Sequence, residues 1–219
     1  MDDLQHISTI IVDYGGVLAH HYCEPYQSFF AKLLNVSMEE SKQLISEKSE
    51  QGKLFRIDKI SMTEFWDWVI DLSKNEKGKT VDYDILQRMW AKTYILDNRI
   101  LELLLLIKNR KSIKLGLFTN TDRERYKYMS DTYSLNKHFD IMICSFQNKL
   151  IKPSKESFIN LISECNVTNP QNILFIDDRE KTVNTAIENG ITGLVYESYE
   201  QLVDFIIENR ILNMEDFLV

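Results

Sequence analysis

The sequence carries carboxylates and a hydroxyl at points where short apolar runs give way to polar turns, and a lysine that opens a helical stretch after another such run. These residues are Asp13, Thr119, Asn120, Lys152, Asp177 and Asp178. Carboxylate oxygens are ligands that Mg²⁺ prefers in proteins. A lysine cation and neighbouring hydrogen-bond donors can hold the oxygens of a phosphoryl group. The set therefore suits a divalent cation together with a phosphate, if the fold brings its members to one place.

Five short apolar runs are the elements that must position this set. They cover residues 9–12, 115–118, 140–144, 173–176 and 193–196. Short, continuously apolar runs are typical of parallel strands covered on both faces. Helical patterns lie between or after them, at residues 100–111, 123–129, 155–165, 182–189 and 199–209. This alternation predicts an α/β fold, a doubly wound parallel sheet in which ligands bind at the carboxyl ends of the strands.

A block of helical patterns interrupts the alternation directly after the first strand. Helices are expected at residues 25–34, 38–51, 62–72 and 83–92, and Ser37 and Ser61 stand where the second and third need an N-cap. Because the block begins at the carboxyl end of a strand, we interpret it as a cap over the site. The alternative is a set of helices that only pack on the edge of the sheet. We therefore predict a core domain of residues 1–18 and 94–219 and a helical cap domain of residues 19–93.

Length and composition limit what the chain can bind. Its 219 residues fit one large domain or a domain with an insertion. The net charge of −7 argues against a nucleic-acid partner or an anionic membrane surface. No apolar run approaches the roughly 20 residues of a membrane span, and the first residues contain no apolar signal core. Three cysteines without a CxxC pair suit a reducing compartment, so we expect a cytoplasmic protein, a monomer or a homodimer.

Four motifs in this order resemble those of the haloacid dehalogenase (HAD) superfamily of hydrolases, in the subfamily with a helical cap after the first motif. They read Ile11-Val12-Asp13-Tyr14-Gly15-Gly16-Val17-Leu18, Leu117-Phe118-Thr119-Asn120, Lys152-Pro153 and Phe175-Ile176-Asp177-Asp178. Gly190 follows Asp178 at the family's spacing. The resemblance covers essentially the whole chain and implies a Rossmann-like core with an inserted helical cap.

The resemblance implies a nucleophile and a metal site. Asp13 would be the nucleophile that forms an aspartyl-phosphate. Asp13 and Asp178 would bind Mg²⁺ directly, together with the backbone carbonyl of Gly15. Asp177 would contribute through water or as an alternative ligand. Metal and nucleophile belong together because a carboxylate attacks a charged phosphate poorly unless positive charge offsets both.

The resemblance also implies how the phosphate would be held. Thr119 would donate its hydroxyl to the transferring phosphoryl group, beside the backbone N–H of Asn120. Lys152 would pair with both the phosphate and Asp13. We therefore expect a Mg²⁺-dependent phosphatase acting on a small phosphate monoester, with a sugar phosphate as one candidate and no nucleic-acid or membrane partner.

Gly15 is the departure from the family pattern that matters most. Most phosphatases of the family have a second aspartate two residues after the nucleophile, which protonates the leaving oxygen and later activates water. A positioned acid or base contributes about 10²–10⁴-fold in rate. Gly15 lacks this group but keeps the backbone carbonyl that the metal uses.

Three interpretations of Gly15 stay open. His20 or His21 could replace the acid, although a histidine pair at the stem of the cap can also be structural. The substrate could need less acid help, since a similar Asp-x-Gly motif occurs in a branch of the family that includes a sugar-1-phosphate phosphatase. The protein could also be a weakly active or non-catalytic binding protein.

Two other activities of the superfamily fit the sequence less well. True dehalogenases also lack the second aspartate, but they lack the paired aspartates found here at Asp177 and Asp178. A phosphomutase needs the acid to return the phosphoryl group.

Overall fold

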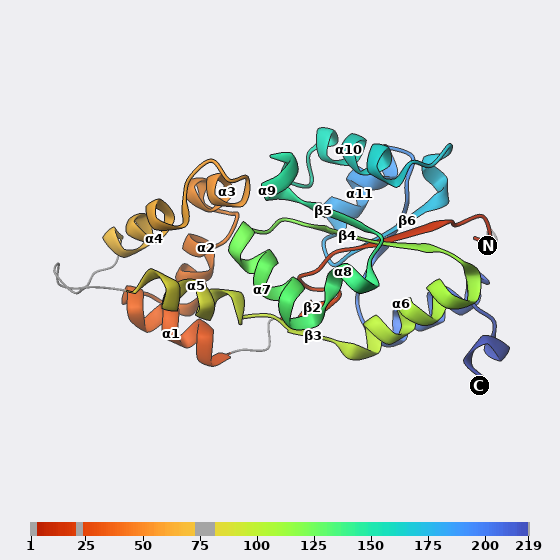
Figure 1. Ribbon diagram of the computed structural model, residues 1–219, viewed down its shortest axis with the longest axis horizontal. Helices are drawn as coiled ribbons and strands as arrows, with labels where there is room; N and C mark the ends of the chain where they lie inside the picture. Colours follow the sequence, from red (N-terminus) through yellow and green to blue (C-terminus); the bar gives the residue numbers. More distant parts are fainter. Residues whose placement is uncertain (1–3, 21–23, 73–81, 219) are drawn as a thin grey trace.

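A five-stranded parallel sheet forms the centre of the protein in the computed structural model, which describes residues 4–20, 24–72 and 82–218. The strands are β1 (Thr9–Val12), β4 (Lys114–Thr119), β5 (Ile141–Cys144), β6 (Ile173–Asp177) and β7 (Thr192–Val195). Their order is β5-β4-β1-β6-β7, and each neighbouring pair is parallel (Figure 1). The predicted doubly wound α/β fold is confirmed.

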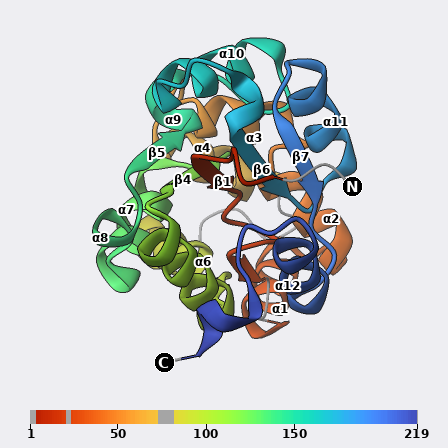
Figure 2. The ribbon, with the colours of Figure 1, turned by 90° about the vertical axis from the view of Figure 1, so that its right-hand side faces the viewer.

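Helices cover both faces of the sheet (Figure 2). They are α6 (Asn98–Lys111), α7 (Arg123–Tyr133) and α12 (Tyr199–Glu208) on one face, and α10 (Lys155–Cys165) and α11 (Glu180–Glu188) on the other. The central strand shows why both layers are needed. Ile10 and Val12 pack into one apolar cluster, and Ile11 between them packs into the other. Successive side chains of a strand point to opposite faces, so an entirely apolar strand buries both.

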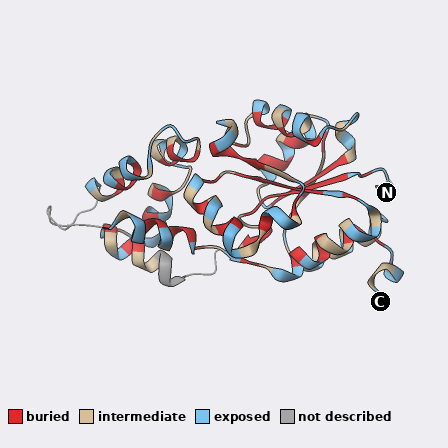
Figure 3. Cartoon of the chain, viewed as in Figure 1, coloured by how far each residue is buried: buried red, intermediate tan, exposed pale blue. Residues whose placement is uncertain are grey.

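In the part of the chain that the structure describes, five further helices lie in sequence between the two strands of a short antiparallel ribbon, β2 (Ala19–His20) and β3 (Ile95–Leu96). These cap helices are α1 (Glu24–Leu34), α2 (Met38–Ile45), α3 (Glu50–Arg56), α4 (Met62–Asp71) and α5 (Tyr83–Ala91). They stand at one end of the sheet, and their buried faces turn toward one another (Figures 1 and 3). Phe30, Phe65 and Trp66 belong to an apolar cluster separate from the two around the sheet. The division into core and cap domains stays a prediction, which this separate cluster supports.

The single helix predicted over residues 38–51 is wrong, because the chain forms α2 and α3 there instead. Ser46 takes an extended conformation at the end of α2, and the Ser49 side chain accepts a hydrogen bond from Gly52 N at the start of α3. Serine side chains bind nearby backbone groups and so compete with a continuous helix. The predicted N-caps Ser37 and Ser61 are confirmed, each as part of a capping box.

The remaining elements are short. They are α8 (Leu135–His138), α9 (Ser145–Asn148), η1 (Pro170–Asn172) and η2 (Met214–Phe217). Among the helices of the described ranges, none has both the length and the apolar character needed to cross a membrane.

Candidate active site

The carboxyl ends of β1, β4 and β6 bring the sequence-predicted residues to one edge of the sheet. Val12 at the end of β1 is in register with Ile176 of β6. The next residue, Asp13, donates its backbone N–H to Ile176 O at 2.9 Å. Thr119 is the last residue of β4 and Asp177 the last of β6. The parallel register therefore places these side chains side by side.

Three carboxylates converge at this edge. Asp13, Asp177 and Asp178 each offer an oxygen, and these oxygens lie within 4.8 Å of one another. Gly16 makes room for them, because it has a positive φ of 96° and a Cβ atom there would overlap the Asp178 carboxylate. Hard oxygen donors crowded in this way fit a divalent cation such as Mg²⁺.

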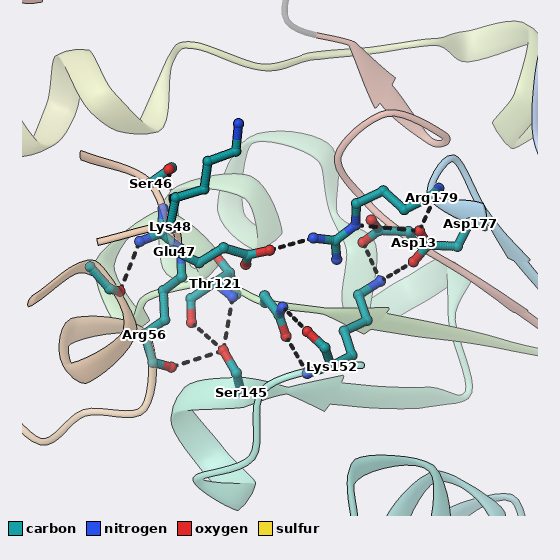
Figure 4. A network of polar contacts seen from close by, with 12 residues as sticks. Asp13, Ser46, Glu47, Lys48, Arg56, Thr121, Ser145, Lys152, Asp177 and Arg179 are labelled. Atoms are coloured by element: carbon teal, nitrogen blue, oxygen red, sulfur yellow. Dashed lines mark hydrogen bonds and ion pairs between the residues drawn. The ribbon is translucent and has the colours of Figure 1, made fainter. Parts of the chain in front are cut away.

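Lys152 links two of the carboxylates from below (Figure 4). Its side chain is fully buried, and Nζ lies 2.9 Å from Asp13 Oδ1 and 2.6 Å from Asp177 Oδ2. The ammonium also donates a hydrogen bond to Phe118 O at 2.8 Å. One buried cation therefore neutralises part of the charge of both aspartates and holds them in place.

The pKa values of the aspartates reflect this crowding. Burial raises the pKa of Asp13 to about 7, although the charge of Lys152 offsets part of the effect. Burial acts in the same direction on Asp177, but the charges and hydrogen bonds of Lys152 and Arg179 together outweigh it, and the pKa of Asp177 lies below its usual value. The pKa of Asp178 is raised by burial and by the charge of Asp177. A bound cation would relieve this unfavourable environment and favour the charged carboxylates.

Asn120 fixes the loop that carries Lys152. Its Nδ2 donates to Lys152 O at 2.8 Å, and Lys152 N donates to Asn120 Oδ1 at 3.0 Å. The amide side chain thus joins the end of β4 to the loop before α10. Sequence reasoning assigned Asn120 only a backbone N–H toward phosphate and missed this positioning contact.

A cavity of about 350 Å³ lies between the strand ends and the cap helices. The sequence-predicted residues on its wall are Asp13, Gly15, Thr119, Asn120, Lys152 and Asp178. Asp177 is fully buried behind them. The cap helices and their connections also contribute charged and aromatic side chains to the wall, which are Glu39, Lys42, Glu47, Lys48, Arg56, Trp90 and Tyr94.

An ion pair joins the cap to the metal-binding candidate residues. Glu47, in the loop between α2 and α3, pairs with the guanidinium of Arg179, which directly follows Asp178 (Figure 4). Arg179 also donates its backbone N–H to Asp177 Oδ1 at 2.9 Å. Burial would raise the pKa of Glu47, but the charges of Arg179 and Arg56 and the hydrogen bonds to Glu47 together outweigh it and lower the pKa. Sequence reasoning missed both residues, since no local pattern relates positions so far apart.

A second, buried contact joins α5 of the cap to α7 of the core. Arg125 donates to Trp90 O at 3.0 Å and to Thr93 Oγ1 at 3.2 Å, and its guanidinium carbon lies 3.6 Å from the centre of the Trp90 ring. Asp122 accepts hydrogen bonds from Gln87 Nε2 at 2.8 Å and Trp90 Nε1 at 3.3 Å. Burial lowers the pKa of Arg125 to about 10, which still leaves it charged at neutral pH.

His20, one candidate for the missing acid, lies on the ribbon and not on the cavity wall. Its Nε2 is 3.5 Å from Asp97 Oδ2, and its ring stacks on Tyr196 with 6.4 Å between centroids. These contacts favour the structural interpretation of His20. His21 lies outside the described residues.

Comparison with known proteins identifies one family. The model of the haloacid dehalogenase-like hydrolases matches residues 7–190 of this chain. Among curated proteins, no sequence is similar enough to count as a match.

Several solved structures share the fold. A HAD family enzyme of Bacteroides thetaiotaomicron, bt-2542, solved as a variant in complex with magnesium and inorganic phosphate, gives a TM-score of 0.74 at 22% identity. The match covers 90% of this chain and 98% of that one. A predicted HAD-like family hydrolase of Porphyromonas gingivalis gives 0.74 at 22% identity, over 92% and 96%. A HAD phosphatase of Thermococcus onnurineus gives 0.57 at 19% identity, over 88% and 90%.

At these identities the structural likeness shows a shared fold, whereas the family match rests on the sequence of most of the chain. Residues from all four sequence motifs, which are Asp13, Thr119, Lys152 and Asp178, also line one cavity. This protein belongs to the haloacid dehalogenase-like hydrolase family.

Proposed function

We propose that the protein is a Mg²⁺-dependent phosphatase that hydrolyses a small phosphate monoester through an aspartyl-phosphate on Asp13. The observation that carries the proposal is the position of the Asp13 carboxylate. It lies on the cavity wall, 2.9 Å from the Lys152 ammonium, with two further carboxylates beside it. A carboxylate attacks a charged phosphate readily only where positive charge offsets both partners.

The residues of the core wall divide the work of the reaction. Asp13 attacks phosphorus in line with the leaving oxygen, whose bond to phosphorus breaks. Lys152, the Thr119 hydroxyl and the backbone N–H of Asn120 hold the phosphoryl oxygens, where charge develops. Water then attacks the aspartyl-phosphate, which releases phosphate and restores Asp13.

The metal would be held by Asp13, Asp178 and the Gly15 carbonyl, with Asp177 acting through water or as an alternative ligand. When bound, Mg²⁺ supplies positive charge that polarises a phosphoryl oxygen and lowers the repulsion between phosphate and carboxylate. The magnesium and phosphate named for the Bacteroides thetaiotaomicron enzyme support this part of the proposal.

The cavity supports a small substrate. Its volume of about 350 Å³ is near the lower end of small-molecule sites, which run from about 300 to 1,000 Å³. The cap helices would close over the bound ester and exclude bulk water during transfer. A sugar phosphate is the first candidate within this class, because its phosphate and one sugar ring match this size.

A second candidate is a binding protein of the same fold with little or no activity. Gly15 is the observation that favours it, because a phosphatase without the usual acid loses about 10²–10⁴-fold in rate unless another group acts.

The test is Mg²⁺-dependent phosphate release from a panel of sugar 1-phosphates, sugar 6-phosphates, nucleotides and an aryl phosphate. We expect Asp13→Asn to lower release by about 10⁴-fold or more, because the nucleophile is lost. Asp204→Asn removes an exposed aspartate of α12 and serves as the matched control, with unchanged activity.

Equal release by the wild type and Asp13→Asn would contradict the proposal. If the wild type releases no phosphate from any ester but these compounds raise its melting temperature, the binding protein is the correct interpretation.

A further inference from the structure

The side chain of Tyr94, in the segment that connects the cap helix α5 to β3, fills the space beside Gly15. A Cβ atom built on Gly15 would lie 2.9 Å from Tyr94 Oη and 3.0 Å from two carbons of the Tyr94 ring. Any larger side chain at position 15, an aspartate included, would start from this Cβ. Tyr94 Oη therefore stands in the space where an acid at position 15 would project. Both residues lie on the cavity wall.

Backbone hydrogen bonds tie Tyr94 to the loop of the nucleophile. Tyr94 directly precedes β3, and Leu96 of β3 pairs with Ala19 of β2. Ala19 in turn donates to Tyr14 O at 2.7 Å and accepts from Gly16 N at 2.8 Å. The position of Tyr94 relative to the first motif is thus set by a short, continuous chain of contacts.

Side chains hold the Tyr94 ring from two further directions. The Tyr14 ring meets it edge-on, with 5.9 Å between centroids. The guanidinium carbon of Arg125 lies 5.1 Å from its centroid, and Arg125 is itself bound to Trp90 O and Thr93 Oγ1. The ring therefore has a defined place at the cavity wall.

The phenol of Tyr94 keeps its proton at neutral pH. Burial raises its pKa, and the negative charge of Asp13 adds to this, while Arg125 acts in the opposite direction. A neutral phenol is a hydrogen-bond donor. The resemblance to the family implies that an acid at position 15 serves the leaving oxygen, so a donor in the space beside Gly15 stands where that acid would act.

We propose that Tyr94 Oη donates a hydrogen bond to the leaving oxygen of the phosphate ester and so takes over part of the role of the missing acid. This inference rests on the proposed phosphatase function. As the bond from Asp13 to phosphorus forms, the bond from phosphorus to the leaving oxygen breaks and that oxygen keeps the electron pair. Tyr94 stabilises the resulting negative charge and retains its own proton. The proton that completes the alcohol comes from water.

The hydrogen bond matters most where much charge develops on the leaving oxygen. A sugar alkoxide is a strong base and needs this stabilisation, whereas a nitrophenolate carries its charge in the ring. Removal of the Tyr94 hydroxyl should therefore affect the two kinds of ester unequally, and a purely structural role would affect them equally.

The experiment compares Tyr94→Phe with the wild type on a sugar phosphate and on nitrophenyl phosphate, both with Mg²⁺. We expect kcat/KM to fall by about 10- to 100-fold for the sugar phosphate, the size expected of a hydrogen bond to a charged group, and by less than about 3-fold for the aryl ester. Tyr128→Phe is the matched control. Tyr128 packs against the apolar core and does not line the cavity, so both activities should be retained.

Two results would overturn the Tyr94 proposal and leave the phosphatase intact. They are an equal loss on both esters and no loss on either, in each case with an active wild type that depends on Asp13. A wild type inactive on every ester would overturn the proposed function together with this inference.

A second pair of variants tests the shared space directly. Tyr94→Ala removes the atoms that a Cβ at position 15 would meet. We expect Gly15→Asp to raise the sugar phosphatase activity of Tyr94→Ala by about 10-fold or more, because an acid then has room to act. No gain in this double variant would overturn the inference that the two groups serve the same position.

Discussion

The two walls of the cavity are built in different ways. On the core side, Asp13 and Thr119 on the wall and Asp177 behind it follow directly from the register of three parallel strands. On the cap wall, Glu47 comes from a loop between two short helices and Tyr94 from the approach to β3. The core wall is therefore positioned by many backbone bonds, whereas the cap wall combines the short β2–β3 pairing beside Tyr94 with individual side-chain contacts such as that of Glu47 with Arg179.

The ion pairs on the two sides of the cavity also differ in how far they are buried. The Lys152 ammonium on the core wall is fully buried between its aspartates, but the side chains of Glu47 and Arg179 are 22% and 39% exposed. Solvent screens the second pair and not the first. The groups proposed to react therefore lie in the more deeply buried wall, whereas the Glu47–Arg179 contact across the cavity is partly exposed.

The largest effect on stability should come from Lys152→Met on the core wall. This change leaves two buried aspartates without their shared cation, and breaking a buried pair in this way typically costs about 3–5 kcal/mol. We expect a loss of this size in the free energy of unfolding, measured in urea at neutral pH without metal. Lys149→Met is the matched control, because Lys149 pairs with Asp58 at the surface. Equal losses in the two variants would remove the contrast between buried and exposed pairs.

Mg²⁺ binding should have a somewhat smaller effect on the free energy of unfolding. Mg²⁺ bound only by the folded protein should raise its free energy of unfolding by about 2.7 kcal/mol at one hundred times the dissociation constant. The rise in melting temperature with added Mg²⁺ measures this. Asp178→Asn should abolish the rise, and Asp204→Asn should retain it. A full rise in Asp178→Asn would show that the metal binds elsewhere.

The smallest effect on stability should come from Glu47→Gln on the cap wall. A partly exposed ion pair contributes less than about 1 kcal/mol, so the fold should be nearly unchanged. Loss of the contact with Arg179 should instead weaken closure and raise KM by about 3- to 10-fold. Glu39→Gln is the control, since Glu39 also lies on the cavity wall but accepts a hydrogen bond only from Gln43 among the hydrogen bonds described. The same rise in both variants would argue against a specific contact.

The ion pair between Glu47 and Arg179 also predicts how the stability of the protein changes with pH. Because its pKa in the folded protein is lowered below 4.5, the pair contributes stability above about pH 4.5 and loses it as the pH falls through the folded value. The stability difference between the wild type and Glu47→Gln should therefore shrink in acid. A difference that grows as the pH falls would contradict the ion pair.

Much of the core of the candidate site could be predicted from the sequence, because its aspartates and its threonine stand at the ends of short apolar runs. Asp13 follows β1, Thr119 ends β4 and Asp177 ends β6, and parallel strands bring their carboxyl ends to one edge. The roles of these residues stay proposals, as do the domain boundaries. Ser37 and Ser61 were likewise readable as N-caps, since capping is a local interaction.

The cap wall could not be predicted in this way. The helical pattern over residues 38–51 did not show that Ser46 and Ser49 divide it, and that division is what places Glu47 at the cavity. Arg125 looks in the sequence like any charged residue at the start of a helix, yet it is buried against Trp90. Its burial depends on where α5 packs.

The sequence by itself determined the parallel sheet, the set of carboxylates and the absence of an acid at position 15, because these follow from residue type and local pattern. Only the tertiary structure decided what stands beside Gly15 and what reaches Arg179. Tyr94 and Glu47 arrive there from distant segments, through the pairing of β2 with β3 and the packing of the cap helices. Contacts of this kind depend on the relative position of whole elements, which no short stretch of sequence specifies.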